Sequence, residues 1–240
     1  MIYGPGFAEA LAINSLSCMV IFSLEKLDKN AGEQPKWKRV PRRSVFLGLL
    51  TSSLCTCTSA CIGGNGYYLR VLLLSIVSGG LLAAWVMDVE THLIYNFVWY
   101  ISGSAGGVNL LLSGNLPEVW WNLLCFVLVQ QLLFGRLYGR ADCHAFSVCA
   151  LSLGAMGMKM QDYLLQMLTA FLLLAAVQFA KCNVTRSGYL KIAIPFVPYI
   201  TVSFWIMMLA KEITAKILGE EITLYQSFEC IFMHCILIFP

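Results

Sequence analysis

Two aspartates stand where long apolar runs give way to polar sequence. Asp88 lies in AAWVMDVETHLIYN, and Asp142 lies in GRLYGRADCHAF just before the next apolar run. Ionisable groups near the depth of a membrane are costly and usually functional. Two carboxylates held close together cannot both ionise cheaply, so one keeps a proton while the other acts as a base toward a water between them. This chemistry requires a fold that brings the two residues together.

Each aspartate also has a structural interpretation. Asp142 immediately precedes an apolar run, where its side chain could accept a hydrogen bond from first-turn amides as a helix N-cap. Asp88 could be a solvated boundary residue, because Glu90 and His92 make the following segment polar. The small residues of the turn 139–141 allow close backbone approach before Asp142. This turn, together with the expected location of both aspartates at one face of the membrane, favours a pair of aspartates that act together.

The composition indicates that the chain resides in a membrane. The chain of 240 residues is 59% hydrophobic and 12% charged, with a mean hydropathy of +0.74, so it has too few charges to cover a soluble globule. The apolar runs lack the alternation of a barrel strand and must be helical in lipid. We expect one all-α domain over 1–240, a polytopic transmembrane helical bundle of about eight or nine spans. The expected spans are 7–24, 44–62, 68–87, 93–112, 119–134, 143–158, 163–180, 195–210 and 224–239.

The basic residues predict the orientation. Twelve of the 16 Lys and Arg residues fall in the segment 25–43 and in the other loops on the same side of the expected bundle. The positive-inside rule assigns these loops to the cytoplasm and the N-terminus to the outside. Asp88 and Asp142 then share the cytoplasmic face, an assignment that did not use them.

Metal binding is not expected. Asp142, Cys143 and His144 offer three ligand types, but successive residues of a helix point about 100° apart and cannot close on one ion. The ten cysteines fall mostly within apolar spans or on the cytoplasmic side, where thiols stay reduced. We expect no metal, no organic cofactor and no structural disulfide.

The segment that begins at Asp88 resembles a motif of the type IV prepilin leader peptidases. In that family an aspartate is followed by a short polar turn that ends in Ile-Pro-Asn. Here Ile94, Tyr95 and Asn96 occupy the ending, with tyrosine in place of proline.

Two later segments resemble the same family. Residues 139–142 are similar to the Gly-x-Gly-Asp signature of these membrane aspartyl proteases, with Gly139 retained and Ala141 in place of the second glycine. The family often has a lysine two residues after this aspartate, and this chain has the titratable His144 there. Residues 195–198, from Pro195 to Pro198, resemble the Pro-Phe-Gly-Pro element that opens a late helix. The three segments occur in family order and cover roughly 68–208.

The resemblance implies an integral membrane aspartyl endopeptidase. Such an enzyme removes short basic leaders from prepilin or pseudopilin precursors at the cytoplasmic face of the cell inner membrane, with Asp88 and Asp142 as the catalytic pair. Its partners would be precursor helices in the lipid bilayer, with no nucleic acid and no cofactor. The resemblance also implies a set of residues that shape the site: Asn96, Gly139, Ala141, His144, Pro195 and Pro198.

One departure from the family narrows the expected activity. Bifunctional members carry an insertion with two Cys-x-x-Cys pairs after the first helix and also N-methylate the new N-terminus. This chain has only the basic loop 25–43 there, without a cysteine. A short, protease-only form is the expectation.

Two other functions remain open. A proton-coupled transporter would also place acids near the membrane, and Glu9 and Glu229 lie within expected spans. A non-catalytic scaffold of a pilus or secretion system could keep the fold and bind pilin-like helices. Glycines such as Gly79, Gly80 and Gly103 could admit a substrate helix or pack the protein's own helices.

Overall fold

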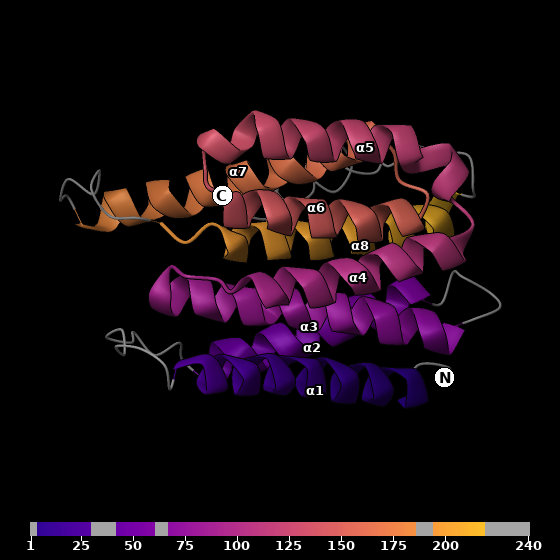
Figure 1. Cartoon of the computed structure of the whole chain (residues 1–240), viewed down its shortest axis with the longest axis horizontal. Coiled ribbons are helices and arrows are strands. Elements are labelled where there is room, and N and C mark those ends of the chain that lie inside the picture. Colours follow the sequence, from indigo (N-terminus) through magenta and orange to yellow (C-terminus); the bar gives the residue numbers. More distant parts are fainter. Residues whose placement is uncertain (1–3, 30–41, 61–66, 186–193, 219–240) are drawn as a thin grey trace.

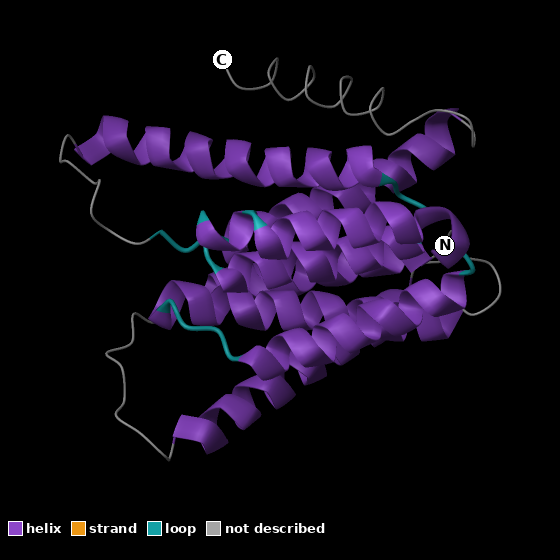
Figure 2. Cartoon of the chain, turned by 45° about the horizontal axis from the view of Figure 1, so that its top comes forward, coloured by secondary structure: helices purple, strands orange, loops and turns teal. Residues whose placement is uncertain are grey.

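The chain folds as a bundle of α-helices. A computed structural model describes residues 4–29, 42–60, 67–185 and 194–218. Within them the chain forms eight α-helices and a single-turn 3-10 helix, and these residues contain no strand (Figure 2). The expectation of an all-α fold is confirmed. The elements are α1 (Gly4–Lys29), α2 (Arg42–Ala60), α3 (Tyr67–Thr91), α4 (Asn96–Ser113), α5 (Leu116–Leu132), η2 (Phe134–Arg136), α6 (Arg140–Ala155), α7 (Met160–Thr185) and α8 (Val197–Leu218).

The helices lie side by side, and successive helices run in opposite directions (Figure 1). Helix α3 occupies the middle of the bundle and packs against α1, α2, α4 and α8. Because the direction alternates, α3 ends at the same end of the bundle at which α4, α6 and α8 begin. We call this the Asp88 end.

The first eight expected spans correspond to α1–α8. Helix α4 begins at Asn96 rather than at 93, and α8 begins at Val197 rather than at 195. Helix α6 begins at Arg140, ahead of the expected span 143–158. The ninth expected span, 224–239, and residues 30–41 of the basic loop 25–43 lie outside the described residues.

Several helices have the character of membrane segments. Within the described residues, three helical segments are long and apolar enough to cross a bilayer: Tyr68–Glu90, Leu116–Arg136 and Met160–Ala180. Shorter apolar helices cover Ala8–Ile21, Val45–Thr56 and Val197–Lys211. Large apolar side chains are exposed on the outer helices, including Leu111 of α4 and Leu132 of α5. Exposed leucines in such number fit a lipid-facing surface.

Small residues let α3 pack closely against its neighbours. A Cβ at Gly79 would lie 2.9 Å from the Cβ of Ser17 on α1, and a Cβ at Gly80 would clash with Ser102 on α4. Both glycines therefore serve packing between the protein's own helices. This close packing fixes the last turns of α3, which carry Asp88.

Candidate active site

Asp88 is buried at the point where α3 meets α8. The residue lies one turn before the end of α3 and is 9% exposed. Its Oδ2 accepts a hydrogen bond of 3.0 Å from the backbone N–H of Val197, the first residue of α8, and the amide of Phe196 also acts on it. The interpretation as a solvated boundary residue is wrong, because α3 continues to Thr91 and holds Asp88 inside the bundle. The carboxylate instead faces the positive N-terminal end of α8.

Asp142 lies in the first turn of α6. The helix begins at Arg140 with Gly139 as its N-cap residue, so Asp142 is the third helical residue. The N-cap interpretation of Asp142 is therefore wrong. Burial, followed by the charge of Asp88, raises the pKa of the Asp142 carboxyl to about 7. The Asp88 charge acts directly on Asp142, so the fold brings the two carboxyl groups within electrostatic reach.

Gly139 sets the position of Asp142. Its backbone has φ 104° and ψ 149°, a conformation open almost only to glycine. A Cβ there would lie 3.4 Å from Oδ2 of Asp142, and the carbonyl oxygen of Gly139 accepts the Cys143 amide at 3.3 Å. Ala141 is already helical, so an alanine side chain meets no backbone strain there.

The start of α8 completes the site. Phe196 caps the helix, because its carbonyl accepts the amides of Tyr199 and Ile200 at 3.0 and 3.3 Å. Pro195 precedes this residue, and Pro198 is buried as the second residue of α8, where a missing amide proton costs no helical hydrogen bond. The three motif segments thus meet at the Asp88 end.

Tyr95 keeps the backbone geometry of the proline that it replaces in the motif. Its φ is −74° and its ψ is 139°, within the range that a proline ring imposes. The ring stacks on Phe97, with centroids 5.9 Å apart. The departure from Ile-Pro-Asn therefore preserves the entry into α4.

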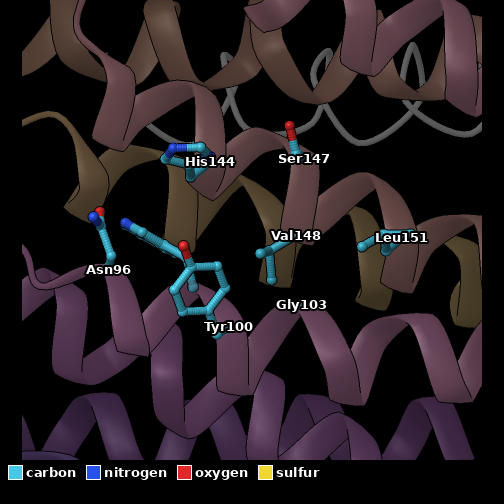
Figure 3. Close-up of a pocket in the computed structure, with 8 residues that line it drawn as sticks. Asn96, Tyr100, Gly103, His144, Ser147, Val148 and Leu151 are labelled. Atoms are coloured by element: carbon cyan, nitrogen blue, oxygen red, sulfur yellow. The ribbon is translucent and has the colours of Figure 1, made fainter.

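Two expected site residues line a separate pocket. Asn96 and His144 belong to an opening of about 260 Å³ between α4 and α6 (Figure 3). Residues two apart on a helix point about 200° away from each other, so His144 leaves α6 on the side opposite to Asp142. Its imidazole lies 6.4 Å from the ring of Trp99 and 3.4 Å, Nδ1 to Nε2, from Gln131 on α5. The structure does not join His144 to the aspartate pair.

Tyr138 is a site residue that the sequence motifs did not indicate. Its ring lies about 6 Å from those of Phe134, Phe146, Phe171 and Phe196, from four different segments. Its hydroxyl donates a hydrogen bond to Oε1 of Gln130, which is buried in α5. The only signal in the sequence is the position of the aromatic residue next to Gly139. Tyr138 therefore anchors the turn before Asp142 to α5, α7 and the start of α8.

The remaining acidic and metal-ligating residues form no competing site in the described part of the chain. That part contains no cluster of three His, Cys, Asp or Glu residues that could hold a metal ion. Glu9, which the transporter hypothesis used, is exposed on α1, and Glu229 lies outside the described residues. The aspartate pair is the most distinctive arrangement for chemistry in this part.

Comparisons with known proteins supply no family assignment. No protein-family model, no curated protein and no solved structure matches the chain. The functional inference therefore depends on the aspartate pair and on the motif residues around it.

Proposed function

We propose that this chain is a membrane aspartyl endopeptidase of the prepilin leader peptidase type. The observation that carries the proposal is the placement of a buried Asp88 and a partly buried Asp142, from helices distant in sequence, within electrostatic reach of each other. A purely structural role would not need a second, partly buried carboxyl near the first, because like charges destabilise the folded state. The convergence of the three motif segments supports the same conclusion.

The surroundings of the two carboxyls suggest different roles. Burial of Asp88 disfavours a negative charge on it, and the backbone amides of Phe196 and Val197 that it faces offset part of this cost. Asp142 has a pKa raised to about 7, by burial and then by the Asp88 charge. We assign Asp88 as the base and Asp142 as the acid at neutral pH.

Hydrolysis then follows from one water and one proton. Asp88 takes a proton from the water as the water oxygen attacks the scissile carbonyl carbon, and Asp142 gives its proton to the carbonyl oxygen. The tetrahedral diol collapses when one hydroxyl returns a proton to Asp142 and the amide nitrogen takes the proton held by Asp88. The C–N bond breaks, which leaves a carboxyl terminus on the leader and a free amine on the mature protein.

The proposed topology places this site at a membrane face. Helices α1–α8, with the expected ninth span 224–239, would cross the cell inner membrane with the N-terminus outside. The Asp88 end would face the cytoplasm, together with the basic loop 25–43. A precursor helix can lie in lipid against the bundle with its leader junction at the Asp88 end. Without a cysteine-rich insertion, the activity would be proteolysis without methylation.

A cleavage assay tests the proposal. The full chain is co-expressed with a pilin-like precursor that carries a short basic leader, and the mass of the precursor is measured. We expect a loss equal to the leader with the native chain and none with Asp88→Asn or Asp142→Asn. Normal cleavage by both variants, at equal membrane expression, would refute the assignment.

A further inference from the structure

A second site lies on the outer side of α6, away from the aspartate pair. The pocket of about 260 Å³ between α4 and α6 opens to the surface of the bundle. Figure 3 shows Asn96 and Tyr100 of α4 on one side of this opening and His144 of α6 on the other. The aspartyl chemistry proposed above uses neither this space nor these side chains.

The lining changes from polar to apolar along the helices. Asn96, Tyr100 and His144 belong to the first two turns of α4 and α6, so they lie at the Asp88 end of the pocket. Gly103, in the third turn of α4, and Leu151, in the fourth turn of α6, line its deeper part. The pocket therefore offers hydrogen-bonding groups at the level of the membrane interface and apolar surface toward the membrane interior. This is the polarity of an amphiphile with its headgroup at the interface.

The α5 side of α6 adds further polar groups beside the pocket. The Gln131 amide nitrogen lies 3.3 Å from Oγ of Ser147 and 3.4 Å from Nδ1 of His144. This contact fixes the imidazole and the hydroxyl, so the polar end of the pocket is already ordered. A preorganised site loses less entropy when a ligand binds.

The charge beside the pocket is positive. Arg140 is exposed at the start of α6, one turn before His144, and its charge acts on the imidazole. Asp142, the acidic residue of the same turn, points about 200° away from His144 around α6. A cation beside polar side chains at the membrane interface favours an anionic lipid headgroup.

We propose that the pocket between α4 and α6 binds one anionic phospholipid from the surrounding bilayer. The phosphate lies against Asn96 and His144 beside Arg140, and an acyl chain follows Gly103 and Leu151 along the two helices. The bound lipid contacts both α4 and α6, which also pack directly against each other. The lipid is thus a bound constituent of the folded protein, and its site does not depend on the peptidase assignment.

Two glycines of α4 provide a matched test. A Cβ at Gly103 would have only Cγ2 of Val148 nearby, at 3.8 Å, so Gly103→Leu fills the pocket without a backbone clash. A Cβ at Gly107, one turn later, would meet nothing within 4 Å, and Gly107 does not line the pocket. Gly107→Leu therefore makes the same chemical change on the same helix while leaving the pocket open.

The experiment measures lipid retention by the full chain. Native protein and both variants are reconstituted in nanodiscs of phosphatidylcholine with phosphatidylglycerol, released into detergent and examined by native mass spectrometry. We expect one phosphatidylglycerol on the native chain and on Gly107→Leu, and roughly tenfold less on Gly103→Leu. Arg140→Gln should weaken the preference for phosphatidylglycerol about fivefold, as expected for one basic residue near a membrane surface. Thermal unfolding of each variant checks that the bundle is intact.

Three results would overturn the lipid site. Equal retention by Gly103→Leu and the native chain would place the lipid elsewhere. Equal retention of phosphatidylcholine and phosphatidylglycerol would exclude an anionic preference. Release of the lipid by excess inorganic phosphate would mean that the pocket recognises a free anion rather than a phospholipid.

Discussion

The turn at Gly139 gives the sharpest test of how the site is built. Gly139→Ala forces a side chain onto a residue with φ 104° and ψ 149°. Holding an alanine there costs about 1–3 kcal/mol, and its Cβ would lie in van der Waals contact with Oδ2 of Asp142 at 3.4 Å. If the backbone instead rotates to a negative φ, the first turn of α6 changes direction and carries Asp142 away from Asp88.

Either response has a measurable size. The free energy of unfolding in detergent should fall by about 1–3 kcal/mol. A displacement of Asp142 by about 1 Å should reduce kcat/KM for a leader-bearing precursor by about 100-fold. Both quantities are measured on the purified full chain, by thermal or chemical unfolding and by the initial rate of leader removal.

Gly135→Ala is the matched control. Gly135 precedes the same turn, its φ is not positive, and a Cβ there would have its nearest contacts at an ordinary 3.8 Å from Cys143 and Gln130. The free energy of unfolding of this variant should stay within about 0.5 kcal/mol of the native value, and its cleavage rate should stay within about twofold. If Gly139→Ala and Gly135→Ala behave alike in both assays, the conformation of Gly139 does not position Asp142.

Three further predictions follow from the same site. Tyr138→Phe removes the hydrogen bond to the buried Gln130 but keeps the aromatic contacts, so the free energy of unfolding should fall by about 1 kcal/mol; a chemical unfolding series that shows no loss would contradict the anchoring role. Asp88→Ala and Asp88→Asn should both abolish cleavage, but only the alanine variant loses the acceptor for the Val197 amide. The melting temperature of Asp88→Ala should therefore be lower than that of Asp88→Asn, by an amount that corresponds to about 0.5–2 kcal/mol. Equal melting temperatures would exclude this contact with α8. Because the pKa of Asp142 is raised to about 7, the proton that it donates is present below this pH and lost above it, so kcat/KM should fall about tenfold for each pH unit above 7; a pH profile flat to pH 9 would rule out Asp142 as the acid.

The helices were predictable from the sequence because their long apolar runs form a simple pattern. Runs of about 20 apolar residues favour helices that satisfy their own backbone, so run length locates α1–α8, although α1, α7 and α8 extend beyond the expected bounds, α8 to Leu218 rather than 210. Their ends were less predictable. Helix α6 begins at Arg140 rather than at 143, because the turn at Gly139 lets the backbone enter the helix before the apolar run starts.

The local chemistry of the motifs was also visible in the sequence. A glycine before Asp142 and a proline pair at the start of α8 indicate special backbone positions, and the structure uses both in that way. Their spacing in the chain does not, however, report how far apart they are in space. The approach of Asp88 to Val197 depends on how α3 and α8 pack, which no local pattern encodes.

His144 shows where reasoning along the chain misleads. It stands two residues after Asp142, so the motif grouped it with the pair, but helical geometry turns it to the opposite side of α6. Tyr138 shows the converse. Its role depends on the rings of Phe146, Phe171 and Phe196 from later segments, and a lone aromatic residue beside a glycine does not indicate these contacts.

The central claim is that Asp88 and Asp142 act as one catalytic pair. A double-mutant cycle on kcat/KM for a leader-bearing precursor measures this directly, with the native chain, Asp88→Asn, Asp142→Asn and the double variant compared at equal amounts of folded protein. Because neither carboxyl can catalyse hydrolysis without the other, the double variant should lose no more activity than the less active single variant. Losses that multiply in the double variant, or a single variant with native activity, would contradict the pair.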